Sequence, residues 1–221
     1  MEDWKVLLRR FWQQQAELFP SEIYFIEGET PKLEGSQNLK EIEQVVLQCQ
    51  KCSLAQTRTN VVFGMGDPHA EIMFIGEAPG ENEDLQGLPF VGRAGELLDR
   101  ILAAIALKRS QVYIANIIKC RPPNNRTPNS EEVESCFPYL FAQIEAIQPK
   151  LIVCLGLVAA RNLLHIEYKL GDFRGKIFQF NGIDVVVTYH PAAILRNPNL
   201  KPDTWEDFKM IRKLYLEKRG S

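Results

Sequence analysis

The stretch "EIMFIGEAPGENEDLQGLPF" (residues 71–90) begins as an apolar run and turns at Gly76 into a loop rich in glycine and proline. A short apolar run that ends in such a loop is typical of a buried strand in a parallel sheet. Loops of this kind often bind phosphate through backbone N–H groups, but carboxylates repel phosphate. The acids in this loop are Glu77, Glu81, Glu83 and Asp84. The loop is therefore predicted to hold something other than phosphate.

Strands and helices alternate along the rest of the chain. Apolar periodicity predicts strands at 71–76, 112–118 and 151–156, and helices at 94–107, 129–147, 157–164 and 204–217. Two further strands, 176–180 and 183–190, flank Asn181-Gly182, which is a strong signal for a hairpin turn. This order predicts an α/β protein with three layers, α/β/α, around a central, mostly parallel sheet.

Three of the predicted strand ends are polar. One runs into the loop after Gly76, the second carries Asn116, and the last delivers His190. Because ligands of open parallel sheets bind beyond the carboxyl ends of the strands, we expect these residues to converge on one pocket. The alternatives are that Asn116 only satisfies loop backbone and that His190 is an ordinary capped histidine.

The N-terminal part is predicted to form an extension. Apolar residues between Trp4 and Leu18 recur at helical spacing, and residues 19–37 are rich in glycine, proline and serine, as in a linker. A short helix that starts near Asn38 would deliver Cys49 at its end. We therefore expect an extension at 1–37 and one domain at 38–221.

Charge and composition limit the class of protein. With 221 residues, 45% of them hydrophobic, the chain suffices for one well-cored domain and an appendage. The net charge of −2 excludes a globally basic protein, so contacts with nucleic acid would need local basic patches, such as those at 119–126 and 196–219. No signal peptide and no long apolar run are seen, which predicts a soluble, cytoplasmic protein without membrane contact.

The cysteines have the spacing of a metal site. The four candidate ligands are Cys49, Cys52, Cys120 and Cys136. A structural zinc site usually has two tight Cys-x2-Cys pairs, whereas this chain has one pair and two dispersed ligands, which favours a 4Fe–4S cluster over zinc. Zinc and unligated cysteines remain open alternatives. Cys154 lies within a predicted buried strand and is interpreted as a core residue. A metal at Cys120 would anchor the basic loop "KCRPPNNRTP" (119–128) beside the predicted pocket.

Three motifs and the cysteine pattern together resemble a known family. The motifs are "GEAPGENED…GLPFVGRAGELL" (76–98), "NIIKCRPPNNRTP" (116–128) and "HPAAILR" (190–196). With the cysteine spacing, they closely resemble the iron-sulfur (family 4) uracil-DNA glycosylases from about Asn38 to Tyr215. The resemblance implies the uracil-DNA glycosylase fold, a 4Fe–4S cofactor, and a hydrolase that removes uracil from DNA in base excision repair.

The resemblance also implies a uracil pocket. Its residues would be Glu77, Ala78, Pro79, Phe90, Asn116 and His190. Phe90 would stack on the flipped base, Asn116 would read its edge, and His190 would donate a hydrogen bond to O2 of the departing uracil. Glu77 is the first candidate for the general base, since Ala78 lies where many other uracil glycosylases carry an aspartate. Glu83 would block the thymine methyl group, or would simply be solvated.

Contacts with DNA follow from the same resemblance. Ile194 and Leu195 would form an apolar wedge, unless they pack in the core. Phosphate contacts are predicted for Arg93, Arg121, Arg126 and Arg196. The implied partner is uracil-containing DNA, single- or double-stranded, bound by a nucleoid-associated monomer that hands its product to downstream repair proteins. The rival readings are a non-catalytic iron-sulfur DNA-binding relative and a relative that becomes covalently trapped on its product. The non-catalytic relative is disfavoured because the chain keeps Phe90, Asn116 and His190. The covalently trapped relative is disfavoured because the cysteine loop has no inserted histidine.

Overall fold

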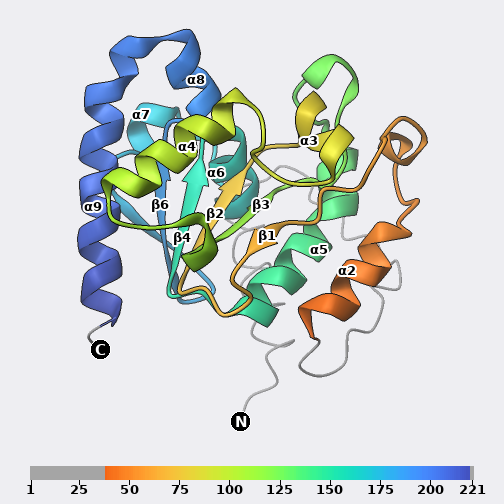
Figure 1. The fold of residues 1–221 in the computed structure, drawn as a ribbon, viewed down its shortest axis with the longest axis horizontal. Coiled ribbons are helices and arrows are strands. Elements are labelled where there is room, and N and C mark those ends of the chain that lie inside the picture. Colours follow the sequence, from red (N-terminus) through yellow and green to blue (C-terminus); the bar gives the residue numbers. More distant parts are fainter. Residues whose placement is uncertain (1–37, 220–221) are drawn as a thin grey trace. The chain divides into compact units, whose positions relative to one another are not determined.

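The computed structural model describes residues 38–219 (Figure 1). The predicted extension at 1–37, including its helix, lies outside the described residues. In the described part a six-stranded sheet has the order β1-β3-β2-β4-β6-β5. Its strands are β1 (Met65–Gly66), β2 (Ile72–Gly76), β3 (Tyr113–Asn116), β4 (Leu151–Leu155), β5 (Ile177–Phe180) and β6 (Ile183–Thr188). The four inner strands are parallel, and the edge strands β1 and β5 pair antiparallel with β3 and β6.

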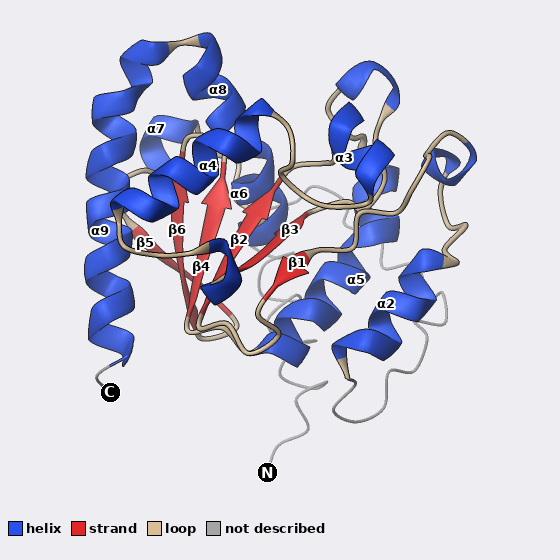
Figure 2. Cartoon of the chain, in the orientation of Figure 1, coloured by secondary structure: helices blue, strands red, loops and turns tan. Residues whose placement is uncertain are grey.

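Helices cover both faces of this sheet (Figure 2). They are α2 (Leu39–Leu47), α3 (Glu81–Gln86), α4 (Arg93–Ala104), α5 (Ser130–Ile147), α6 (Leu157–Leu164), α7 (Leu170–Phe173), α8 (Pro191–Arg196) and α9 (Lys201–Arg219). Alternate residues of the strands face opposite sides, as a pleated sheet requires. Met73 and Ile75 pack with α5 and α6, whereas Ile72 and Phe74 pack with α4 and α9. The predicted three-layer architecture is confirmed.

The strand order creates one switch point. The chain runs from β2 to β3 on one side and then crosses to β4 on the other side of β2. In open parallel sheets the crevice beyond such a point is the usual ligand site. The loop that starts at Glu77 leaves β2 at this place, so the fold itself selects the 77–90 loop as the wall of the site.

The structure differs from the predicted elements mainly at their ends. The helix predicted at 94–107 ends at Ala104, and the last helix begins at Lys201 instead of 204 and continues to Arg219. The predicted loop after Gly76 contains the short helix α3, whose first turn holds three acids that favour a helix N-terminus. The hairpin at Asn181-Gly182 is confirmed, and both of its residues have positive φ. Within residues 38–219 no helix is long and apolar enough to span a membrane.

Candidate active site and cysteine pocket

Four residues meet at the carboxyl edge of the sheet, and we call them the strand-end cluster: Gly76, Phe90, Asn116 and His190. Gly76 and Asn116 are register partners at the ends of β2 and β3. A Cβ atom on Gly76 would overlap Asn116 Oδ1 and approach Phe90 Cζ to 2.8 Å, so only glycine fits there. The ring centroids of Phe90 and His190 lie 5.5 Å apart. The predicted convergence is therefore seen in the structure.

Asn116 is almost completely buried, with 1% of its surface exposed. Its Oδ1 atom has no hydrogen-bond partner among the described residues. Buried polar atoms are nearly always paired, so an orphaned one calls for an explanation such as an absent ligand. The alternative was that Asn116 satisfies loop backbone, and its Oδ1 atom does not do so within residues 38–219.

His190 caps the N-terminus of α8. Its Nδ1 accepts a hydrogen bond from the backbone N–H of Ala192 at 3.1 Å, which leaves the proton of a neutral imidazole on Nε2. Some of its surface stays exposed, but burial of the ring lowers the pKa of His190 to about 4; the positive charge of Arg196 adds to this, and Glu83 opposes it. His190 thus caps α8 and is also a neutral N–H donor beside Phe90.

The residues after β2 form the start of the loop that the sequence predicted as the pocket floor. Glu77 and Ala78 are half-buried and Pro79 is buried. Burial raises the pKa of Glu77, while a hydrogen bond with the Thr127 side chain and the charge of Arg196 act in the opposite direction. A carboxylate with a raised pKa suits a general base. Thr127, which no sequence motif marks, joins Glu77 to the loop that follows Cys120.

The other three acids of this loop bind groups of the protein itself. Glu83 Oε1 accepts from the backbone N–H groups of Val91 and Gly92, at 2.9 and 2.8 Å. The buried Asp84 accepts from the N–H groups of Thr59 and Asn60 in the same manner. Glu81 lies 3.5 Å from Arg121. Glu83 and Asp84 thus stabilise the fold of this region, and Glu83 is not the solvated side chain of the alternative. A role of Glu83 against the thymine methyl group stays a prediction.

Phe90 has an unusual backbone conformation. Its φ is +54°, in the left-handed region, which a bulky residue adopts at a cost of about 1 to 3 kcal/mol. Only 5% of its surface is exposed, and its carbonyl packs so closely on α4 that a Cβ atom on Gly95 would overlap it. The surrounding structure therefore holds Phe90 in place. This conformation could not be predicted from the sequence, because positive φ at a phenylalanine has no local motif.

The predicted DNA contacts differ in their surroundings. Leu195 and Arg196 are exposed on α8, whereas Ile194 is buried with 2% of its surface exposed. In this conformation the core-packing alternative therefore holds for Ile194, and the wedge would consist of Leu195. Arg93 is exposed at the start of α4.

The two arginines of the 119–128 loop also differ. Arg121 bonds Asn125 Oδ1 at 2.7 Å and lies near the exposed Glu81. Arg126 makes two short hydrogen bonds to Glu132, whose carboxylate is buried. These bonds lower the pKa of Glu132. Arg126 is thus bound to the protein itself, which weakens the prediction that it contacts phosphate.

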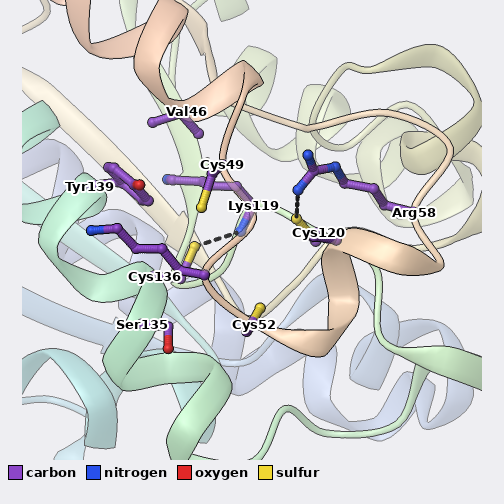
Figure 3. A pocket seen from close by; sticks show the side chains of 11 residues that line it. Val46, Cys49, Cys52, Arg58, Lys119, Cys120, Ser135, Cys136 and Tyr139 are labelled. Atoms are coloured by element: carbon purple, nitrogen blue, oxygen red, sulfur yellow. Dashed lines mark hydrogen bonds between the residues drawn. The ribbon is translucent and has the colours of Figure 1, made fainter.

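The four candidate cysteine ligands line one pocket (Figure 3). Cys49 and Cys52 follow α2, Cys120 lies four residues beyond the end of β3, and Cys136 is on α5. No three of the metal-binding side chains in residues 38–219 are grouped closely enough to hold a single ion. The fifth cysteine, Cys154, is fully buried in β4, which confirms its interpretation as a core residue.

The chemistry of the pocket suits a thiolate-bound group. The Lys119 backbone N–H donates to Cys136 Sγ at 3.2 Å, and Arg58 Nη1 donates to Cys120 Sγ at 3.4 Å. Burial raises the pKa of the Cys120 thiol and raises that of Cys136 to about 12, so both would be protonated unless a bound metal stabilised their thiolates. Four soft sulfur donors with two N–H donors therefore fit an iron-sulfur group.

Lys119 connects the cysteine pocket with the strand-end cluster. It is buried, lines the pocket, and its Nζ donates to the Asn116 carbonyl oxygen at 2.9 Å and to Gln143 Oε1 at 2.6 Å. Burial lowers the pKa of Lys119 to about 8, against the opposing effect of Cys136 and Cys120. Lys119 belongs to the basic patch predicted at 119–126, but it is buried and adds no charge to the surface.

Comparison with known proteins now defines the class. Residues 63–209 match the family model of the "Uracil DNA glycosylase superfamily". This range includes β2, the whole strand-end cluster, and two of the four candidate cysteine ligands. The chain thus has the fold of this superfamily.

Similar proteins show which branch of the superfamily the chain belongs to. The chain is 47% identical to the type-4 uracil-DNA glycosylase of Archaeoglobus fulgidus over 191 residues, which cover 83% of this chain and 96% of that protein. It is 49% identical to the type-4 enzyme of Sulfurisphaera tokodaii (81% and 86% covered) and 44% identical to that of Pyrobaculum aerophilum (79% and 93% covered). The chain belongs to the type-4 uracil-DNA glycosylases.

Proposed function

We propose that this protein hydrolyses the N-glycosidic bond between uracil and deoxyribose in DNA and leaves an abasic site for base excision repair. The type-4 relatives carry the name of this activity. The observation in the structure that carries the proposal is the orphaned Oδ1 of Asn116, buried beside Gly76 and Phe90 at the switch point of the sheet.

Asn116 is suited to read uracil. Uracil presents a donor at N3 and an acceptor at O4, whereas cytosine presents an acceptor at N3 and a donor at N4. The Asn116 amide accepts from N3–H through Oδ1 and donates to O4 through its N–H group. Cytosine would face this amide acceptor to acceptor and donor to donor, and would leave buried groups unpaired at a cost of about 1 to 3 kcal/mol each.

Phe90 and Gly76 shape the space for the base. A uracil in a duplex must be extruded from the stack before an enzyme can reach its glycosidic bond. The Phe90 ring offers an aromatic face to the extruded base, and stacking of this kind is worth about 1 to 3 kcal/mol. Because Gly76 has no side chain, the Phe90 ring can pack directly against the end of β2, next to Asn116 Oδ1.

His190 and Glu77 act on the bond that breaks. As the bond lengthens, negative charge grows on uracil O2 and positive charge grows on the sugar C1′. The neutral His190 donates its Nε2–H to O2, a contact worth about 3 to 4 kcal/mol in similar roles. Glu77 stabilises the sugar charge and accepts a proton from the attacking water. The proton ends on a carboxylate whose raised pKa makes it a competent acceptor.

We propose further that Cys49, Cys52, Cys120 and Cys136 hold a 4Fe–4S cluster, with zinc as the alternative occupant. The support is that all four line one pocket with two N–H donors to sulfur. When bound, the cluster supplies a structural cross-link among the segments that carry these cysteines. That role fits the site, because Lys119 reaches the Asn116 carbonyl and Thr127 reaches Glu77 from the Cys120 loop.

The substrate is proposed to be uracil in single- or double-stranded DNA, bound through local charge because the net charge is only −2. Leu195 is the apolar wedge, and Arg93, Arg121 and Arg196 contact phosphates. We expect the protein to act as a monomer on the nucleoid in the cytoplasm and to pass abasic DNA to downstream repair proteins.

One experiment separates this activity from its rivals. The protein is incubated with a duplex that contains a single uracil, and the product is tested for an alkali-labile abasic site and for a crosslinked band. Alkali-labile DNA without a crosslink supports the proposal. A crosslinked band indicates a covalently trapped relative, and intact DNA that still binds the protein indicates a non-catalytic one.

A further inference from the structure

The backbone around Phe90 is bound from both sides by charged side chains. Arg109 Nη2 donates to the carbonyl oxygens of Pro89 and Phe90, at 2.6 and 2.8 Å. On the other side, Glu83 Oε1 accepts from the N–H groups of Val91 and Gly92. Four consecutive residues, 89–92, are thus held by one guanidinium and one carboxylate. We call this arrangement the Phe90 clamp.

The guanidinium is itself fixed. Arg109 Nη1 donates to both carboxylate oxygens of Asp99, at 2.9 and 3.2 Å. Asp99 is on α4 and Arg109 follows that helix, so the clamp is tied to the same helix whose first turn packs on the Phe90 carbonyl at Gly95. A charged donor bound to two carbonyls and a carboxylate has little freedom, because both of its terminal nitrogens are engaged. The buried Nε of Arg109 has no hydrogen-bond partner among the described residues.

The positive φ of Phe90 explains why a clamp is useful. A bulky residue left to itself favours negative φ, and a change of this angle would swing the ring away from Asn116 and His190. Strained conformations persist only where the surroundings over-determine them, and they gather at functional sites. Here the ring that touches His190 is the one whose backbone is bound on both sides.

We propose that Arg109 and Glu83 are positioning residues that hold the Phe90 ring ready for the extruded uracil. This inference rests on the proposed function, since it assigns the clamp to base stacking. Neither side chain needs to touch the base: Arg109 fixes the carbonyls before the ring, and Glu83 fixes the N–H groups after it. The site is thereby preorganised before DNA binds.

A double-mutant cycle tests the proposal. Arg109→Gln removes the two-carbonyl grip and should slow single-turnover uracil excision about 10-fold. In a Phe90→Leu background the same change should cost no more than about twofold, because no ring is left to position. Arg161→Gln is the matched control: Arg161 also donates to a backbone carbonyl, that of Tyr168, and pairs with an acid, but in a different segment. Equal losses from Arg109→Gln in both backgrounds would overturn the proposal.

Glu83 provides a second cycle. Glu83→Gln keeps an oxygen that accepts from Val91 and Gly92, so excision should stay within about threefold of wild type. Glu83→Ala removes the acceptor and should slow excision about 10-fold, again only when Phe90 is present. If Glu83→Gln is as slow as Glu83→Ala, the charge of Glu83 matters and its loop contacts do not.

Hydrogen exchange tests the Phe90 clamp without an activity assay. In the DNA-free protein, Arg109→Gln should speed amide exchange at Val91 and Gly92 about 10-fold or more, while amides of β4 stay unchanged. Unchanged exchange at 91 and 92 overturns the clamp even if excision is slowed. If the wild type excises no uracil, the proposed function fails, and the exchange result still decides whether the clamp exists.

Discussion

The strand-end cluster and the cysteine pocket lie on the two sides of Lys119, yet they are built in different ways. The cluster takes Gly76 and Asn116 from strand ends whose register is fixed by the sheet. The pocket gathers its sulfurs from the end of α2, the loop after β3 and the helix α5. No strand pairing joins these three segments within the described residues, so their mutual position depends on packing and on what they bind.

Because of this difference, we expect the strand-end cluster to determine the rate of the reaction and the cysteine pocket to determine the stability of the fold. Groups set by sheet register stay in place when one of them is changed, so a substitution in the cluster should lower the rate and leave the fold intact. Segments gathered by a bound group lose their tie when a ligand is removed, so a substitution in the pocket should first lower stability. Substitutions in each region test this division.

The largest effect is expected from Asn116→Asp. Asp replaces the amide donor with a second acceptor, and sites built on such pairs reject the wrong partner by about 10⁴-fold. We expect uracil excision to fall about 10³-fold or more and the thermal midpoint to change by only a few degrees. A small gain of cytosine excision should appear in mismatched or single-stranded DNA, where flipping costs less.

Single-turnover rates on matched uracil and cytosine oligonucleotides measure this effect. Asn162→Asp, the same change in α6, should keep the wild-type ratio of the two rates. If Asn116→Asp excises uracil within threefold of wild type, Asn116 does not read the base. If the Asn116→Asp variant unfolds instead, the strand-end cluster also determines stability, and the proposed division between the two regions is wrong.

His190→Ala is expected to have the next largest effect. Loss of an N–H donor to the departing uracil should slow base release about 100-fold, with DNA binding nearly unchanged, because the contact strengthens in the transition state. Binding and single-turnover rates on the same duplex test this. Equal losses in the two would make His190 a residue that positions DNA.

The pH dependence checks the charge state of His190. Its pKa of about 4 in the folded protein lies below the usual 6.5, so the folded state binds fewer protons than the unfolded chain. The part of the stability that depends on neutral His190 should therefore be complete above pH 6.5 and lost as the pH falls toward 4. Denaturation curves should show this loss in wild type and less of it in His190→Gln. If the free energy of unfolding depends on pH in the same way in both proteins, the pKa of His190 is not lowered.

Much of this division could be foreseen from the sequence. The loop after Gly76, Asn116 and His190 were predictable as a group because parallel strands end at one edge, and short apolar runs mark such strands. The Phe90 clamp was not, because Arg109 reaches Pro89 from 20 residues away and no periodicity reports such a contact. The burial of Lys119 could not be predicted for a similar reason. A lysine in a basic loop is usually solvated, and only tertiary packing buries this one.

Cys120→Ser should change stability more than chemistry. We expect the purified wild-type protein to be brown and the variant to be colourless and less soluble, with a clearly lower thermal midpoint. The folded fraction should retain excision within about 10-fold, since Asn116 and Gly76 remain in register. Visible absorption, iron content and melting curves measure these effects. Cys154→Ala in β4 is the control that should keep the colour. A colourless wild type that contains one zinc per chain, prepared without air, would show that zinc is the occupant.

The smallest effect is expected for Arg121, at the border between the two regions. Arg121 follows Cys120, and its guanidinium bonds Asn125 and approaches the exposed Glu81, so little holds it back from a phosphate. Each phosphate contact contributes about 0.9 to the slope of log affinity against log salt, so Arg121→Gln should flatten that slope by about one unit. Arg126→Gln is its matched partner in the same loop. Because Arg126 is bound to the buried Glu132, its loss should leave the slope unchanged and lower the thermal midpoint. If Arg126→Gln flattens the slope and Arg121→Gln does not, the phosphate lies on the other side of the loop, and the contacts seen without DNA do not predict those made with it.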